Sequence, residues 1–421
     1  MPDISEEQFT AEALSFLEAN ATRKQERKAQ KWGEGSDKVA IFEEKSREAE
    51  FADVEKAKAW RQKKFDAGFG WISGPTQYGG RALPSTYERI FNGLEAQFET
   101  AGSGPFTIGL GMVAPTILAH ASVVAKEKYL RAMYRGEIVG CQLFSEPGAG
   151  SDLASLQTRA ERDGDEWVIT GQKVWTSGAH YSDLGEVICR NDPDLPKHKG
   201  LTGFIVDMHA PGVEVRPLRQ MTGGANFNEV FFTEVRVRDD HRLGDVNQGW
   251  TVALTTLMNE RAAIGAGGGG GGGLLGVERL SQMLAAMGKS DDKVLRDELM
   301  KIHIGQQVNK YTGLRALAKV KAGQLPGPEM SINKLAGALN MMAVSDFVSH
   351  VLGAKLIADS GEWGTYAWSQ IVLGGPGSRI AGGSDEVMRN IVGERVLGLP
   401  KEPGIDSVTP FNQLKVGTQK T

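Results

Sequence analysis

The sequence predicts an α+β protein in which a small antiparallel β-domain separates an N-terminal helical domain from a C-terminal helical bundle. Apolar residues recur at helical spacing over 6–138, the period falls to two over 140–243, and helical spacing returns over 276–360. A chain of 421 residues can form two or three domains with substantial cores. We therefore expect helical residues 1–138, β-domain residues 139–243, helical residues 244–403 and a tail of 404–421.

The composition excludes several classes of partner. The 48 basic and 52 acidic side chains nearly balance, so nothing favours a nucleic acid as ligand. Cys141 and Cys189 lack metal-site spacing, and so few cysteines favour a reducing compartment over a disulfide framework. The acidic N-terminus lacks signal-peptide features, and we find no apolar run of the roughly 18 residues that a membrane span needs. We expect a cytoplasmic protein without a metal site or a membrane span.

In the N-terminal third, Leu14, Leu17 and Ala21 have helical spacing. Further along, Gly109–Ala114 imitates the glycine pattern of a dinucleotide-binding turn. We reject that interpretation because no strand is expected before the glycines and Pro115 should interrupt the helix that follows them.

A glycine- and proline-rich segment, Glu146–Asp152, predicts a loop whose backbone N–H groups and hydroxyls can face a ligand. A hairpin follows, in which Thr158–Arg162 and Trp167–Thr170 flank a turn that contains the strong hairpin signal Asp163-Gly164.

A third expected strand, Gln172–Ser177, places Trp175 beside Thr176 and Ser177. An indole next to hydroxyls can contact a flat heterocycle while the hydroxyls bond its ring atoms. The simpler alternative is a surface loop with an ordinary core tryptophan.

A helix that opens at Trp250 carries four residues on one face, namely Ala253, Leu257, Glu260 and Ile264. A carboxylate on an apolar stripe suits a general base, because burial disfavours its charged form. Alternatively, Glu260 lies at the edge of the stripe, solvated or paired with an arginine.

Together these segments resemble the acyl-CoA dehydrogenase family. LFSEPGAGSD and GQKVWTS match the family's flavin loop and following strand nearly residue for residue, and the resemblance extends from about Trp71 to Pro400. It implies FAD as cofactor, and cofactor contacts from Leu143, Phe144, Ser145, Ser151, Trp175, Thr176, Ser177, Ser384 and Glu386. It implies substrate contacts from Ser151, Arg261, Gly382 and Gly383, whereas Gln142 stands where the family often has an aromatic residue.

The resemblance also bears on the catalytic base. Most members carry a glutamate in a segment resembling I-Y-E-G-T-x-Q-I-x-R, where this chain has Gly382. A minority, including isovaleryl- and long-chain-type enzymes, carry the base on the helix after the β-domain, just before an arginine. Asn259-Glu260-Arg261 matches that arrangement, which implies Glu260 as the base, with Asp385 and Glu386 as nearby acidic alternatives.

The family's reaction is α,β-dehydrogenation of an acyl-CoA thioester to the 2-enoyl-CoA. The resemblance implies that a backbone N–H near Gly382 and a flavin hydroxyl hold the thioester carbonyl. Glu260 would take the α-proton while a hydride passes to the flavin, and an electron-transfer flavoprotein or similar acceptor would receive the electrons. The C-terminal helices resemble the bundle through which members form homotetramers, or dimers.

Two other functions stay open. One is a flavin oxidase on the same scaffold. The other is a non-catalytic partner subunit of a mixed tetramer, because Ala285–Gly288 stands where the family usually has R-x-x-F-G. Arg296 is a candidate substitute for the arginine of that motif.

Residues 265–273 are glycine apart from Ala266. Each glycine in a helix costs ~1 kcal/mol relative to alanine, so a flexible linker is one interpretation. Because the family continues this helix along the acyl pocket, the other is a pocket widened for a bulky or branched acyl group.

Overall fold

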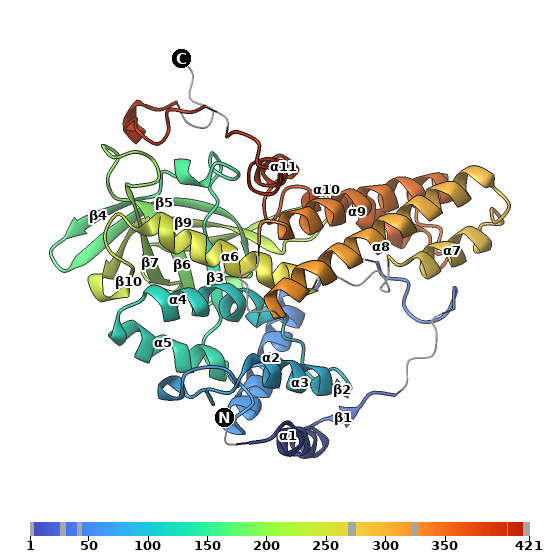
Figure 1. Ribbon diagram of the computed structural model, residues 1–421, viewed down its shortest axis with the longest axis horizontal. Coiled ribbons are helices and arrows are strands. Elements are labelled where there is room, and N and C mark those ends of the chain that lie inside the picture. The colour runs from blue at the N-terminus through green and yellow to red at the C-terminus, as the bar shows by residue number, and fades with distance from the viewer. Residues whose placement is uncertain are drawn as a thin grey trace.

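The computed structural model describes residues 4–25, 31–39, 44–267, 275–321, 327–401 and 403–415. Figure 1 shows a central sheet with the N-terminal helices along one side and a pair of long C-terminal helices projecting from it. The N-terminal elements are α1 (Glu6–Asn20), β1 (Thr22–Arg23), α2 (Arg47–Asp66), α3 (Ser85–Glu95), β2 (Phe98–Glu99), α4 (Ala114–His120) and α5 (Val123–Arg135). The predicted helical N-terminal third is confirmed.

Local sequence explains where α1 begins and which face it buries. Ser5 accepts a hydrogen bond from the backbone N–H of Gln8, and the Gln8 side chain bonds back to Ser5, which completes a capping box. Phe9, Ala13 and Leu17 lie four residues apart and are fully buried against α3. Apolar spacing therefore fixes how this helix packs.

The glycine-containing segment before α4 is helical. Gly109–Val113 forms a π-turn that continues into α4, and Pro115 lies in the first turn of α4. Because the π-turn runs directly into α4, Pro115 lies within a continuous helical segment, which accommodates the loss of one backbone N–H there. The expectation that Pro115 interrupts a helix is therefore wrong. A Cβ at position 109 would lie 2.9 Å from the nitrogen of Gly140, so glycine allows this turn to pack on the sheet.

The sheet comprises β3 (Gly140–Leu143), β4 (Arg159–Asp163), β5 (Glu166–Ser177), β6 (Leu184–Arg190), β7 (Leu201–Asp207), β8 (Val213–Leu218), β9 (Phe227–Arg238) and β10 (Arg242–Leu243). Its order is β10-β7-β6-β4-β5-β9-β8, and β3 pairs with β6. Most pairs are antiparallel, but β3 and the first residue of β4 run parallel to β6. The β-domain is confirmed and its purely antiparallel character is corrected. Alternating periodicity indicates strand faces, whereas strand partners depend on long-range packing.

β4 and β5 form the predicted hairpin, with Gly164 and Asp165 in the turn. The expected third strand is not separate, because β5 continues to Ser177. Its pairing with β9 shifts register twice, once before Gly171 and once between Lys173 and Thr176. Bulges of this kind bend a strand and change the direction of its side chains.

α6 (Gly249–Gly267) crosses the sheet over β6 and β7 and leads to the C-terminal helices. These are α7 (Val277–Ala286), α8 (Lys293–Lys321), α9 (Met330–Leu352), α10 (Ser369–Ser378) and α11 (Asp385–Ile391). α8 and α9 are the projecting pair in Figure 1, and their side-by-side packing confirms the predicted long helices.

In the described residues, one stretch is long and apolar enough by length and composition to cross a membrane. It is Met330–Leu356, with a mean hydropathy of 1.3, and it differs from the expectation that no such run exists. Phe347, Val348 and Val351 in this stretch are buried in a core shared with α7 and α8. This packing accounts for part of the apolar character of α9, since 39% of the stretch is buried.

Residues 403–415 are held against the β-domain, although the sequence suggested only a tail. Phe411 is buried, and the guanidinium carbon of Arg190 lies 3.5 Å from the centre of its ring. Lys197 bridges Asp406 of this segment, at 2.5 Å, and Asp152 of the glycine-rich loop, at 2.9 Å. The C-terminal segment is therefore linked to that loop.

Candidate active site

A buried ion pair fixes the glycine-rich loop to the sheet. Lys173 on β5 is fully buried, and its ammonium donates to Glu146 Oε1 at 2.8 Å and to the carbonyls of Phe144 and Ile188 at 3.1 and 2.8 Å. Glu146 also accepts from the backbone N–H groups of residues 157 and 158, at 2.6 and 2.9 Å. Burial raises the pKa of Glu146, but Lys173 and these donors outweigh burial and leave that pKa below its ordinary value.

The residues just before Glu146 connect β3 to the glycine-rich loop. Leu143 is buried in the core of the β-domain, and Phe144 is buried in a second core that the sheet shares with the N-terminal helices and α6. The carbonyl of Ser145 accepts from the N–H of Val174 at 2.8 Å, which ties this strand end to β5. Cofactor contacts of Leu143 and Phe144 would therefore come from their main chains.

The second bulge in β5 exposes Trp175. Its φ of 62° lies in the left-handed region, and its indole is 58% exposed, packed edge-on against Phe227 with 5.8 Å between ring centres. Thr176 is buried, and within the described residues its hydroxyl has no hydrogen-bond partner. Asn228 donates to the Thr176 carbonyl at 3.0 Å, and Ser177 ends the strand half-buried. An orphaned hydroxyl beside an exposed indole fits a planar, hydrogen-bonding ligand.

The start of α11 meets the glycine-rich loop. The Ser151 hydroxyl lies 3.4 Å from that of Ser384, which also accepts from the N–H of Val387 at 3.3 Å and so caps α11. Gly382–Gly383 has φ values of 66° and 96°, a left-handed backbone that glycine adopts without strain. Lys334 on α9 donates to the Gly383 carbonyl. The fold thus brings together two expected contacts, Ser151 and Ser384, that are 233 residues apart.

The two acidic residues at α11 differ in environment. Asp385 is buried and bonds Arg379 at 2.6 Å. Glu386 has a 76% exposed side chain that lies 3.9 Å from Arg389. Asp385 is committed to an ion pair and Glu386 faces solvent, so neither matches the environment of Glu260 described next.

α6 carries Glu260 along the edge of the core. Ala253 is fully buried in the core that also contains Phe144, and Leu257 packs against it. Glu260 follows on the same face and is half-buried. The apolar stripe is therefore observed as far as Glu260, while the side chains of Arg261–Gly267 lie outside the described residues.

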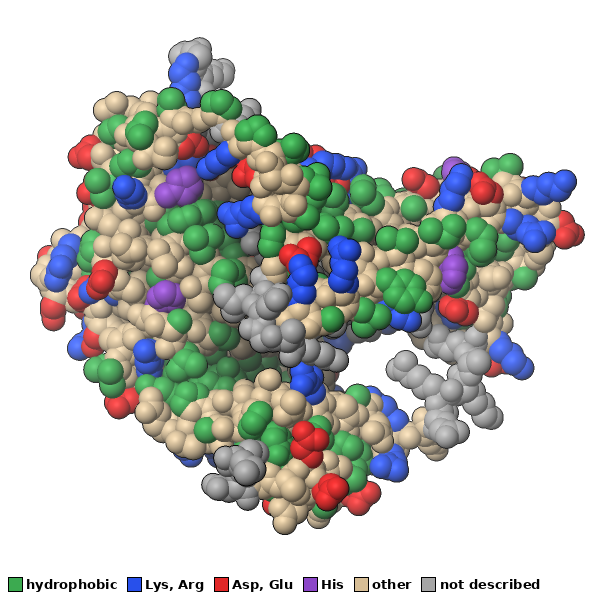
Figure 2. Space-filling model, viewed as in Figure 1, with side chains coloured by type: hydrophobic (Ala, Val, Ile, Leu, Met, Phe, Trp, Pro, Cys, Tyr) green, Lys and Arg blue, Asp and Glu red, His purple; other side chains and the backbone are tan. Residues whose placement is uncertain are grey.

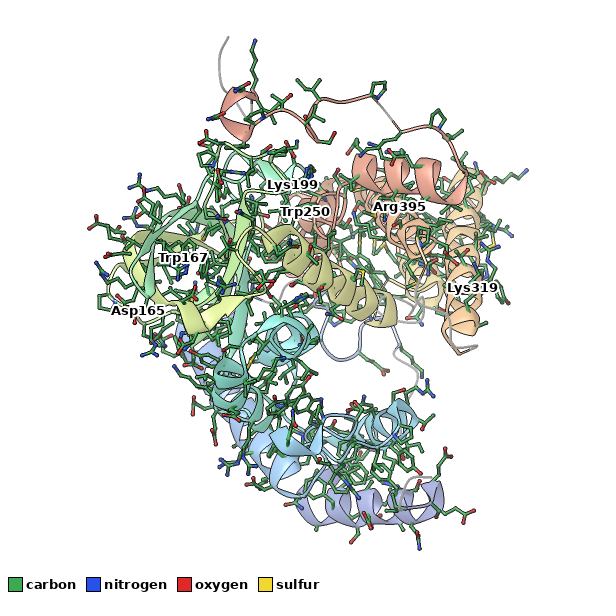
Figure 3. The ribbon with its side chains drawn as sticks, turned by 60° about the vertical axis from the view of Figure 1, so that its left-hand side comes forward. Asp165, Trp167, Lys199, Trp250, Lys319 and Arg395 are labelled. Carbon is green, nitrogen blue, oxygen red and sulfur yellow. The ribbon has the colours of Figure 1, made fainter. Side chains whose placement is uncertain are left out.

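Figure 3 shows Trp250 at the start of α6, beside the loop between β6 and β7 that carries Lys199. The Trp250 ring meets that of His198 edge-on, with 4.8 Å between ring centres. This contact ties the first turn of α6 to the sheet.

A buried carboxyl under α6 was missed by the sequence analysis. Glu186 on β6 is fully buried, and its Oε1 accepts from the Thr256 hydroxyl at 2.5 Å. Its other oxygen has no partner in the part of the chain that the structure describes. Burial raises the pKa of Glu186 to about 8. A lone glutamate in an apolar strand carries no motif, so periodicity could at most have marked Glu186 as an unusual buried charge. By contrast, Glu146 and Lys173 lie inside the matched motifs.

Two family models match the chain. Residues 141–235 match the acyl-CoA dehydrogenase middle domain, and residues 247–397 match the acyl-CoA dehydrogenase C-terminal domain.

Acyl-CoA dehydrogenase FadE34 of Mycobacterium tuberculosis is 39% identical over 328 residues, which are 78% of this chain and 44% of that protein. The chain thus spans less than half of FadE34. Acyl-CoA dehydrogenase IpdE1 of the same organism is 35% identical over 83% of this chain and 89% of its own length. Among solved structures, the Tcur3481-Tcur3483 steroid ACAD has a TM-score of 0.69 at 27% identity, covering 83% of this chain and 93% of that chain.

Proposed function

The chain belongs to the acyl-CoA dehydrogenase family, and on that premise we propose that it oxidises an acyl-CoA to the 2-enoyl-CoA with FAD as cofactor and Glu260 as base. Membership makes the chain an oxidoreductase with a flavin cofactor. One observation carries the assignment of the base: a half-buried carboxylate ends the apolar stripe of α6, whereas position 382 is glycine.

Several features of the site fit a flavin. The orphaned Thr176 hydroxyl and the exposed face of Trp175 suit its planar ring system. Ring contacts from residues 143–145 would use main-chain atoms other than the carbonyls of Phe144 and Ser145, which accept from Lys173 and Val174. The neighbouring hydroxyls of Ser151 and Ser384 suit the polar chain of the cofactor. When bound, the flavin would supply hydride acceptance from the substrate's β-carbon.

The protein's own residues handle the proton and the carbonyl. Glu260 takes the α-proton, and its partial burial limits exchange of that proton with water. The backbone N–H of Gly382 holds the thioester oxygen and stabilises the negative charge that develops there. Arg261, the next residue, is proposed as a substrate contact.

We propose a bulky, ring-bearing acyl group as the substrate class. The solved relative named a steroid ACAD supports this choice. So does the sequence 265–273, which follows the base and offers almost no side chains to fill a pocket. Residues 268–273 lie outside the described residues. Gly268→Leu should slow the oxidation of ring-bearing acyl-CoAs more than that of short straight-chain ones, and equal slowing would contradict the proposal.

The reaction is tested by an anaerobic screen of acyl-CoAs with the purified flavoprotein. The expected result is bleaching of the oxidised flavin by at least one substrate, with one equivalent of the 2-enoyl-CoA found by mass spectrometry. No bleaching across straight, branched and ring-bearing chains would contradict the function.

We propose an electron-transfer flavoprotein-type acceptor. Reduced protein should reoxidise slowly in air and rapidly with such an acceptor. Fast reoxidation by oxygen with stoichiometric peroxide would instead identify an oxidase. The relatives named above are dehydrogenases, so neither the oxidase nor the non-catalytic subunit is favoured.

We also propose that the chain assembles with other chains of the same fold through α8. Apolar side chains lie exposed along this helix at spacings of three and four residues, and Figure 2 shows apolar groups along the projecting helical pair. A homotetramer or dimer is one form, and a two-component assembly, as the name Tcur3481-Tcur3483 suggests for that relative, is the other. The residues are Met300, Ile304, Val308, Tyr311 and Leu314.

A further inference from the structure

A chain of hydrogen bonds crosses the otherwise apolar interface under α6. Glu186 on β6 accepts from the hydroxyl of Thr256 on α6 at 2.5 Å. That hydroxyl also lies 2.8 Å from the hydroxyl of Thr116 on α4, where either group can be the donor, and the Thr116 hydroxyl lies 2.9 Å from the carbonyl of Met112. These contacts join four elements, namely β6, α6, α4 and the π-turn that precedes α4.

The surroundings of these hydrogen bonds allow them to restrict the rotation of α6 on the sheet. Glu186 is paired across the sheet with Gln142 on β3 and Ile205 on β7. Neighbouring residues of the interface are apolar and buried, among them Ile188 and Val252. In such an interface an apolar contact tolerates small rotations of a helix, whereas a short hydrogen bond to a buried acceptor does not.

Thr256 lies one helical turn before Glu260, so the two side chains share a face of α6. The sequence after the base is almost entirely glycine from residue 265 to 273, and glycine is a weak helix former. The helix preference of the glycine-rich segment is therefore too weak to fix the rotation of α6. The bond from Thr256 to Glu186 is a polar contact between α6 and the sheet within one turn of Glu260.

We propose that Glu186 is a positioning residue, which acts through Thr256 to set the rotation of α6 and so the direction of the Glu260 carboxylate. This inference rests on the proposed role of Glu260. Glu186 touches neither the substrate nor the flavin in this proposal, and it transfers no proton.

The chemistry of the buried carboxyl supports this role. A neutral carboxyl is compatible with its fully desolvated position, and burial raises its pKa to about 8. On the helices packed against it, Glu260 lies one turn after Thr256 on α6 and His120 lies one turn after Thr116 on α4. The ring of His120 bonds Thr255 at 2.8 Å. Ionisation of Glu186 above its pKa would place an uncompensated charge beside Thr256 and disturb the helix.

The test measures anaerobic flavin bleaching in a single turnover, with the acyl-CoA found in the screen above. Glu186→Leu removes the acceptor and leaves the threonine hydroxyls bonded to each other and to backbone carbonyls. We expect it to slow bleaching about 10- to 100-fold, the cost of a small misplacement of a reacting group. Flavin content and the Kd for acyl-CoA should stay unchanged. Glu186→Gln keeps an acceptor for Thr256 and should keep most of the rate.

The pH profile separates positioning from general structural support. Bleaching by the wild type should slow as pH rises through about 8, and bleaching by Glu186→Gln should not. Thr256→Val, which breaks the same bond from the other side, should slow bleaching as Glu186→Leu does, and it remains informative if the leucine variant does not fold. Thr251→Val, on an exposed face of the same helix, is the matched control and should have no effect.

The proposal is overturned if Glu186→Leu and Thr256→Val bleach at the wild-type rate. It is also overturned if the bleaching rate of Glu186→Gln falls as far as that of Glu186→Leu. A failure of the proposed function looks different. In that case none of the acyl-CoAs bleaches the flavin of the wild type, or the flavin of Glu260→Gln bleaches as fast as that of the wild type.

Discussion

At the scale of single residues, Lys173 and Glu146 determine where the cofactor loop lies. Lys173 is fully buried and its partners are Glu146 and two carbonyls. Lys173→Met should remove the compensating charge and leave Glu146 buried and ionised, which costs about 3–5 kcal/mol of the free energy of unfolding. Urea unfolding at pH 7 measures this loss.

The double variant Glu146→Gln/Lys173→Met is the control, because it also removes the stranded charge. It should recover part of the lost stability. Equal stability of Lys173→Met and the wild type would show that the ion pair does not hold the loop.

Glu186 should make stability depend on pH. Its pKa in the folded chain is about 8, against an ordinary value of 4.5, so the folded state keeps a proton that the unfolded state has released between these values. Stability therefore falls as pH rises from about 4.5 to about 8, by about 1 kcal/mol per pH unit. Glu186→Gln should match the wild type near pH 5 and be more stable near pH 8. Parallel melting curves for the two proteins across this range would contradict the prediction.

The site was only partly predictable at this scale. Trp175, Ser151 and Ser384 were identified through motif matches, and the structure brings Ser151 and Ser384 within 3.4 Å of each other. The exposure of Trp175 depends on the second bulge in β5, and no glycine between Lys173 and Thr176 marks that bulge in the sequence. Glu186 could not be predicted, because its partner Thr256 is 70 residues away and the bond depends on how α6 lies over the sheet.

At the scale of elements, the C-terminal segment 403–415 stabilises the loop between β6 and β7. Phe411 packs under Arg190, and backbone bonds join residues 411 and 412 to Leu195 and Pro193. Phe411→Ala should lower the free energy of unfolding by about 2 kcal/mol, the size of a desolvated cation–π contact. It should also increase deuterium uptake in residues 191–200.

Val408→Ala in the same segment is the matched control, since Val408 is exposed. It should leave both measurements unchanged. If Phe411→Ala behaves like Val408→Ala, the segment does not support this loop.

Elements were predicted well where a local signal exists. The Asp163-Gly164 turn fixed the hairpin, and the apolar stripe fixed the face of α6. The parallel pairing of β3 with β6 was not predictable, because it joins segments about 45 residues apart without a local signal. The continuity of β5 through Gly171 was missed because a glycine within a strand resembles a break and can equally mark a bulge.

At the scale of the whole molecule, α8 should hold subunits together. Light scattering after size exclusion should give a mass that is a multiple of the chain's 45.4 kDa. Ile304→Glu with Val308→Glu places two charges in the exposed apolar stripe and should dissociate the assembly to monomers. Val294→Glu, equally exposed but off the stripe, should leave the mass unchanged. An unaltered mass in the double variant would exclude this face as the interface.

The order of helices, sheet and helices was predictable because two changes of apolar period divide the chain into these three parts. The closure of the C-terminal segment over the β-domain was not, because single polar pairs such as Lys197 with Asp406 create no periodic pattern.

The most direct test of the central claim compares the wild type with Glu260→Gln in anaerobic single-turnover bleaching by a good acyl-CoA substrate. Glutamine preserves size and hydrogen bonding but cannot accept the α-proton. We expect bleaching to slow at least about 100-fold, the range of general-base catalysis, with flavin content and substrate Kd unchanged. Bleaching at the wild-type rate would contradict the account and move the base to another residue.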